Sequence, residues 1–294
     1  MEPMPLINEP ALIVDGCLVV ADIHIGIEHE LSLSGIHIPT QVQRRTDRIL
    51  RYLEDTRADR VVLLGDIKHN VPWTSECERE DIPRFLRSIA ERATIDIVPG
   101  NHDSGLAYLI PWSEDRRIKL HRSKGFTLEN IGFVHGHAWP ALDLLSCDYV
   151  VMGHLHPSIR LADPLGHLSS QPVWIRTRFV EQVFRERYPD LERFADPRVI
   201  IMPAFNELAG GIAFNEATYD TLLGPLFTNR ALELETAEVY LLDGSYLGSV
   251  SQLRHFVPKP KLRKVQRRRR KASNTTFAPF DEGAKFSTTR ESGR

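Results

Sequence analysis

The sequence is poor in cysteine and lacks a long apolar run. Its three cysteines, Cys17, Cys77 and Cys147, are far apart and odd in number, so they form neither a disulfide framework nor a CxxC metal site. No stretch approaches the roughly 18 apolar residues of a transmembrane helix, and the acidic, proline-rich start lacks the basic region of a signal peptide. We therefore expect a cytoplasmic protein with reduced, buried thiols and no membrane partner.

Basic charge is scarce in most of the chain and concentrated at one end. Residues 257–294 contain 12 basic and 3 acidic side chains, whereas the rest of the 294-residue chain contains 25 basic and 36 acidic ones. The end segment is basic at first and then rich in Ser, Thr and Gly, with too little apolar surface to order itself. We expect one domain over residues 1–256, long enough to bury a core, and a disordered tail over residues 257–294.

The basic part of this tail has two interpretations. Nine of the 13 residues from Lys259 to Lys271 are Lys or Arg, a cluster that can bind nucleic acid without sequence preference. A solubilising or partner-docking tail would have the same composition. The predicted nucleic-acid contacts are Lys259, Lys261, Arg263, Lys264, Arg267, Arg268, Arg269, Arg270 and Lys271.

Strand-like and helix-like stretches alternate along residues 1–256, which predicts an α/β fold. Apolar runs on both sides of Asp15-Gly16 predict a hairpin, and residues 158–176 predict a second one with its turn near Asp163-Pro164. Further buried strands are expected at 60–64, 95–98, 131–134 and 147–152, and late strands of a second sheet within 197–205 and 237–253. Helical spacing predicts helices over 40–56, 81–93 and 177–195.

Polar side chains that bind metals follow five of the apolar runs, each at the point where the run ends. Because ligands bind beyond the carboxyl ends of strands in α/β sheets, we expect all five ends to meet at one site. A turn, a helix N-cap or an edge pair of a strand would explain any one of them, so the prediction depends on the whole set. The set is Asp22 and His24; Asp66; Asn101, His102 and Asp103; His135 and His137; His154 and His156.

The chemistry of this set indicates two metal ions. Imidazole, carboxylate and amide donors without thiolate suit Mn²⁺, Fe or Zn²⁺, and they are too many for one ion. Two ions about 3.5–4 Å apart form a clamp for in-line displacement at phosphorus. The residues alone therefore predict a dinuclear site that acts on phosphate esters.

The order DIH, GD, GNHD, HGH, GHLH over residues 12–160 resembles the calcineurin-like metallophosphoesterase superfamily. The resemblance implies a four-layer αββα sandwich of two mixed β-sheets flanked by helices, with a dinuclear centre at the strand ends. It implies that Asp22, His24, Asp66 and His156 hold the first metal and that Asp66 bridges to the second, held by Asn101, His135 and His154. It also implies that His102 is the general acid or stabilises the phosphate, and Asp103 would orient it.

Finer features are similar to one branch of that superfamily. Protein phosphatases continue these motifs as GDxVDRG and GNHE, whereas this chain has GDIKHN and GNHD. His69 and the segments ADIHIGIEHELSLSGIHIP, HGHAWP and PAFNELAGG resemble the SbcD-related archaeal and DNA-ligase-associated phosphoesterases. This implies His69 beside the substrate backbone, phosphodiester bonds of nucleic acid as substrate, and a DNA-repair partner. The DNA-capping domain and ATPase-docking segment of full SbcD nucleases have no counterpart in the sequence.

Several alternatives stay open at this point. His137 either supports His135 and contacts phosphate, or is a buried histidine with a backbone partner. Mn²⁺ is the expected metal, and Fe or Zn²⁺ would also fit. The rival functions are a small-molecule phosphodiesterase, for cyclic nucleotides or nucleotide pyrophosphates, and a module that recruits nucleic acid or a repair partner through its tail. The sequence leaves open whether residues 177–195 cap the site or dock a partner, and whether the protein is a dimer like many relatives.

Overall fold

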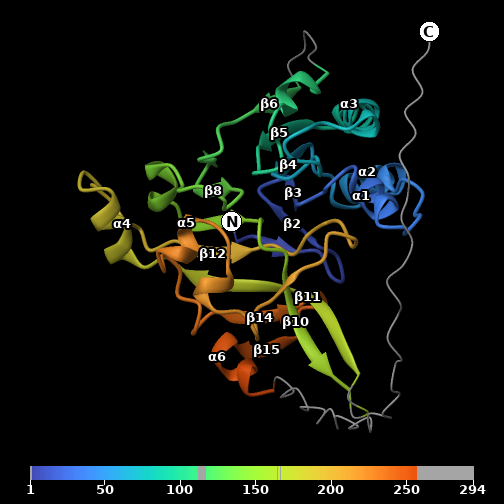
Figure 1. The fold of residues 1–294 in the computed structure, drawn as a ribbon. Helices are drawn as coiled ribbons and strands as arrows, with labels where there is room; N and C mark the ends of the chain where they lie inside the picture. Colours follow the sequence, from blue (N-terminus) through green and yellow to red (C-terminus); the bar gives the residue numbers. More distant parts are fainter. Residues whose placement is uncertain (1, 112–116, 164, 166, 257–294) are drawn as a thin grey trace, which may run out of the picture. The chain divides into compact units, whose positions relative to one another are not determined.

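The computed structural model describes residues 2–111, 117–163, 165 and 167–256, and its strands form two sheets packed face to face (Figure 1). Helices lie on the outer face of each sheet. The predicted architecture of two mixed sheets flanked by helices is confirmed. The predicted tail over 257–294, with its basic cluster, lies outside the described residues.

The first sheet has the strand order β1-β2-β3-β4-β5-β6. Its first three strands are antiparallel neighbours, and β3 to β6 run parallel. The predicted hairpin is confirmed, and its turn residues Asp15 and Gly16 have φ angles of 47° and 72°. The strands are β1 (Met4–Pro5), β2 (Ala11–Val14), β3 (Cys17–Ala21), β4 (Arg60–Leu64), β5 (Thr94–Val98) and β6 (Ile118–Leu120).

The second sheet has the order β13-β10-β11-β12-β9-β8-β7, and β14 and β15 extend it beside β11. Strands β8, β9 and β12 run parallel, while β11 is antiparallel to β10, β12 and β14. The strands are β7 (Phe126–Leu128), β8 (Ile131–Val134), β9 (Tyr149–Met152), β10 (Pro157–Ala162), β11 (Leu168–Arg178), β12 (Arg198–Ile201), β13 (Ile212–Ala213), β14 (Glu238–Leu241) and β15 (Tyr246–Ser249).

The core forms three layers of side chains because the central strands are buried on both faces. In β3, Leu18 and Val20 pack under the helices, whereas Val19 and Ala21 point into the layer between the sheets. This explains why β3 and β4 are almost continuous apolar runs in the sequence. The outer layers are covered by α2 (Val42–Thr56) and α3 (Glu76–Ala90) on one side and by α4 (Glu181–Arg187), α5 (Pro225–Thr228) and α6 (Val250–Leu253) on the other.

One predicted helix and one predicted strand need correction. The stretch 177–195 is helical only over Glu181–Arg187, since Thr177 and Arg178 still pair with β12, and the residue before Pro189 is disfavoured in a helix. The end of the predicted strand region 237–253 is the short helix α6, which begins with a capping box at Ser249. Within the described part of the chain, none of the helices combines the length and apolarity needed to cross a bilayer.

Candidate metal centre

The predicted ligands follow the carboxyl ends of β3, β4, β5, β8 and β9. Strands β3, β4 and β5 are parallel neighbours in one sheet, and β8 and β9 are parallel neighbours in the other, so each sheet directs its ligand loops to one edge. The two edges meet where Asp66 of the first sheet lies 3.3 Å, Oδ2 to Nε2, from His135 of the second. The structure thus brings Asp22, His24, Asp66, His135, His154 and His156 together.

Five of these residues have a left-handed backbone, with φ of 58° at Asp22, 47° at His24, 48° at Asp66, 80° at His154 and 45° at His156. This conformation is strained for residues with a side chain and persists only where the surroundings enforce it. Its concentration at one site marks a functional centre.

Two glycines of the motifs leave room for the ligands. A Cβ at Gly65 would lie 2.3 Å from His135 Nδ1, and one at Gly100 would lie 2.1 Å from Asp66 Oδ1. Any side chain at either position would displace a ligand from the centre.

The first group of donors is Asp22, His24, Asp66 and His156, with their ligand atoms within 4.8 Å of one another. His24 Nε2 lies 3.2 Å from His156 Nε2, and His156 Nε2 lies 3.3 Å from Asp22 Oδ1. His24 Nε2 is also 3.8 Å from Asp66 Oδ2. Two imidazole nitrogens and two carboxylates that face a common point are the donor set of a divalent transition-metal site.

The second group is Asp66, His135 and His154, with Asn101 beside it. His135 Nε2 lies 3.3 Å from both Asp66 Oδ2 and Asn101 Oδ1. Both ring nitrogens of the largely buried His154 lack a hydrogen-bond partner among the described residues, which is costly unless a ligand satisfies them. The same Asp66 oxygen faces both groups, so the residues fit two metal ions with Asp66 as the bridge.

The protonation states of the histidines suit this arrangement. Burial lowers the pKa of His24 to about 3 and that of His154 to about 4, so both imidazoles are neutral. Burial would also lower the pKa of His135, but the carboxylates of Asp66 and Asp22 raise it to about 9. Burial alone would raise the pKa of Asp66, but His135 and His24 hold it well below its usual range.

His102 lies beside the centre with one ring nitrogen occupied. Its Nδ1 donates to the backbone carbonyl of His69, and its backbone N–H donates to Asp66 Oδ1 (2.8 Å). The Asp103 carboxylate instead accepts the backbone N–H groups of Gly100 (2.8 Å), Ile67 (2.9 Å) and Lys68 (3.1 Å). Asp103 therefore ties the GD loop to the GNHD loop, and the carbonyl of His69, not the carboxylate of Asp103, orients His102.

His69 and His137 flank the two groups. His69 Nδ1 lies 3.2 Å from His24 Nδ1, its Nε2 lies 2.6 Å from Glu30 Oε2, and its ring stacks on His102. His137 is half-buried, with its ring centroid 5.2 Å from that of His135. Burial lowers the pKa of His137 to about 4, so its ring is neutral beside the centre.

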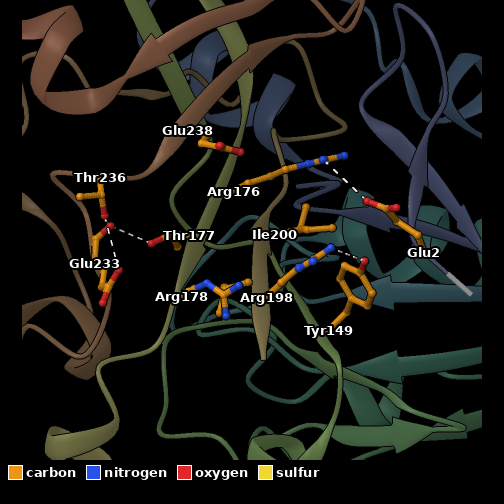
Figure 2. Close-up of a pocket in the computed structure, with 11 residues that line it drawn as sticks. Glu2, Tyr149, Arg176, Thr177, Arg178, Arg198, Ile200, Glu233, Thr236 and Glu238 are labelled. Atoms are coloured by element: carbon orange, nitrogen blue, oxygen red, sulfur yellow. Dashed lines mark hydrogen bonds and ion pairs between the residues drawn. The ribbon is translucent and has the colours of Figure 1, made fainter. Parts of the chain in front are cut away.

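A cavity of about 330 Å³ lies at the other end of the second sheet (Figure 2). Tyr149 and Arg198 in its wall are the first residues of β9 and β12, whereas His154 follows the last residue of β9. Arg198 Nη1 donates to Tyr149 Oη (3.0 Å). Its lining contains as many basic as acidic side chains: Arg176, Arg178 and Arg198, and Glu2, Glu233 and Glu238. Because it lies at the opposite ends of the strands, this polar cavity is separate from the metal centre.

A two-sheet sandwich that holds two His/Asp groups around a shared carboxylate defines a class of dinuclear metal hydrolases. The family model for calcineurin-like phosphoesterases matches residues 17–160. Residues 17–160 thus match the calcineurin-like metallophosphoesterases, and with its His/Asp ligand groups the chain is a metal-dependent phosphoesterase. No curated protein sequence matches this chain significantly.

Two solved structures are similar to this chain, and the first of them shares its fold. The nuclease MPE from Pseudomonas putida is 17% identical with a TM-score of 0.50, and the match covers 82% of this chain and 96% of that chain. YfcE, a phosphoesterase from E. coli, is 14% identical with a TM-score of 0.35, and the match covers 79% of this chain and 96% of that chain.

Proposed function

We propose that the protein hydrolyses phosphodiester bonds of nucleic acid, with DNA as the first substrate to test and Mn²⁺ as the metal. The observation that carries the proposal is the Asp66 carboxylate, of which one oxygen faces both ligand groups and the other accepts the backbone N–H of His102. A pair of ions sharing a carboxylate recognises phosphate itself, so the centre suits any phosphate ester.

Each ligand group would hold one ion: Asp22, His24, Asp66 and His156 the first, and Asp66, Asn101, His135 and His154 the second. When bound, two divalent cations lower the pKa of water towards 7 and stabilise the charge on the phosphoryl oxygens. The chain's own part is to keep both groups in place: Asp103 joins the two loops, and Asp66 Oδ1 accepts the His102 amide.

His102 is the proton donor in this proposal. Because Nδ1–H is held by the His69 carbonyl, the other proton of the imidazolium lies on Nε2. From there it passes to the oxygen that leaves phosphorus when the P–O bond breaks. The hydrogen bond between the His102 amide and Asp66 keeps this donor in register with the bridging ligand.

Three points support nucleic acid as the substrate. His69 and the segment PAFNELAGG resemble the SbcD-related branch. The Pseudomonas putida protein of the same fold is a nuclease by name. Residues 259–271 supply nine cationic side chains, which would bind the phosphates of a polyanion with an affinity that falls as the salt concentration rises. A cytoplasmic location and a DNA-repair partner stay predictions that accompany this proposal.

The test is an assay of the full chain with Mn²⁺ on single- and double-stranded DNA, RNA and a generic aryl phosphodiester. His102→Ala is run beside it, with His167→Ala, an exposed histidine of the β10–β11 hairpin, as the matched control. We expect the wild type and the His167→Ala control to cleave at least one of the polymers, and His102→Ala to cleave none. Hydrolysis of the aryl diester with all polymers intact would refute nucleic acid as the substrate and favour a small phosphodiester. Failure to hydrolyse any diester would refute the proposed reaction.

The tail is tested separately by replacing Arg267, Arg268, Arg269 and Arg270 with glutamine in the full chain. If these side chains contact phosphates, DNA binding weakens and its dependence on salt becomes shallower, while hydrolysis of the aryl diester is unchanged. An unchanged salt dependence would refute the tether and favour a partner-docking or solubilising tail.

A further inference from the structure

A buried asparagine grips the loop that carries the first two metal ligands. Asn206 is 2% exposed and comes from the segment after β12 of the second sheet, whereas the loop follows β3 of the first. Its Nδ2 donates to the backbone carbonyls of Ile23 (2.8 Å) and His24 (3.3 Å), and its backbone N–H donates to the carbonyl of Asp22 (3.3 Å). One residue therefore binds three consecutive carbonyls of the ligand loop.

The orientation of this amide is determined by its other partners. Asn206 Oδ1 accepts from Arg45 Nη2 (2.8 Å) and from the backbone N–H of Leu208 (2.9 Å). The oxygen faces two donors and the nitrogen faces two acceptors, so a flipped amide would lose all four bonds.

A buried ion pair holds the asparagine in turn. Arg45 and Glu28 are 6% and 5% exposed, and Arg45 Nη1 lies 2.8 Å from Glu28 Oε1. Glu28 Oε1 also accepts the backbone N–H of Gln41 (3.1 Å). Buried charges of this kind are tolerated only when each has a partner of opposite charge, which Arg45 and Glu28 supply to each other. The fork of the guanidinium is needed because one nitrogen serves Glu28 and the other serves Asn206.

We propose that Asn206, held by Arg45 and Glu28, is a positioning residue for the first metal ion. The loop that it grips is strained, with left-handed φ at both Asp22 and His24. Asn206 holds the backbone in that conformation and so keeps both side chains aimed at one point. The inference rests on the metal centre of the proposed function and is independent of the substrate. The second ion, whose ligands Asn206 does not touch, is unaffected.

The test is Mn²⁺ binding by the full chain. It is measured by calorimetric titration and by the electron paramagnetic resonance signal of the Mn²⁺ that stays unbound. In Asn206→Ala we expect one ion to bind about 10–100-fold more weakly, as for other groups that orient metal ligands, while the second ion keeps its affinity. The matched control is Asn215→Ala. Asn215 is 3% exposed and also clamps backbone, through the N–H (3.0 Å) and carbonyl (2.9 Å) of Arg160, but it grips no metal ligand.

The outcomes separate the alternatives. If Asn206→Ala and Asn215→Ala lower thermal stability alike but only Asn206→Ala weakens one ion, the proposal is supported. If both variants keep two ions at wild-type affinity, or weaken them equally, Asn206 has only a structural role and the proposal is overturned. If the wild type binds no Mn²⁺, the proposed metal centre fails first, and this inference fails with it.

Arg45→Lys keeps the inference testable if Asn206→Ala does not fold. The lysine keeps the positive charge beside Glu28 but cannot also donate to Asn206 in the fork geometry. We expect a smaller loss of affinity for the same ion, with the other ion unchanged. Wild-type binding of both ions by this variant would overturn the proposed link between Arg45 and the metal ligands.

Discussion

Metal binding at the second ligand group should displace a proton from His135. His135 Nδ1 donates to the backbone carbonyl of Leu64 (2.9 Å), which leaves Nε2 to face Asp66 and Asn101. Because Asp66 and Asp22 raise the pKa of this buried histidine to about 9, the proton on Nε2 is present at pH 7. A metal ion needs the neutral imidazole, so binding must release that proton.

The size of the effect follows from the pKa. At pH 7 a group with a pKa of about 9 is neutral in only about 1% of molecules, so displacing its proton costs about 2.7 kcal/mol and lowers the apparent affinity about 100-fold. Affinity should therefore rise about tenfold for each pH unit between pH 6 and pH 9 and then level off. His156, whose pKa is raised because Asp22 offsets the effect of burial, adds to the release at the first group.

Calorimetry of EDTA-treated protein measures this directly. Titration with Mn²⁺ in two buffers of different ionisation enthalpy gives the number of protons released, and we expect roughly one to two at pH 7. His135→Gln should flatten the pH dependence of binding at the second ligand group. An affinity that is constant from pH 6 to pH 8, with no proton release, would refute the assigned pairing of His135 with the two carboxylates.

Three further predictions concern the centre. Asp66→Asn should lose both metal ions and all activity, because one oxygen serves both groups; two ions retained by elemental analysis would contradict the bridge. His102→Ala should lower kcat by about 10²–10⁴-fold with two ions retained, and an unchanged rate would contradict its role. Gly65→Ala should lower stability by about 1–3 kcal/mol and weaken the ion at His135, since its φ is +72° and its Cβ would meet that ring. Gly105→Ala is the control, because Gly105 has a similar φ of +79° but open space around it, so this variant has the backbone strain without the clash. Equal melting temperatures of the two variants would contradict the clash at Gly65.

The ends of the central strands, and the metal ligands that follow them, could be predicted because a local sequence pattern marks both. Buried parallel strands are apolar runs, and Asp22 and Asp66 each directly follow such a run or its terminal glycine. The topology of α/β sheets then sends these ends to one edge. Residue types were therefore enough to predict which side chains meet, although the distances came only from the structure.

The parts that sequence reasoning missed depend on contacts between distant segments. Arg45 and Asn206 are 161 residues apart, and nothing around Arg45 distinguishes it from the exposed cations of the same helix. The segment PAFNELAGG was the available signal for Asn206, but the sequence does not say which backbone it grips. His102 is oriented by the carbonyl of His69, and a carbonyl is present at every position, so residue type carries no information about it.

The central claim is that two metal ions share Asp66, and anomalous diffraction from crystals grown with Mn²⁺ tests it most directly. We predict two peaks about 3.5–4 Å apart on either side of the Asp66 carboxylate, one among Asp22, His24 and His156 and one among Asn101, His135 and His154. A single peak, or two peaks that do not share Asp66, would contradict the account.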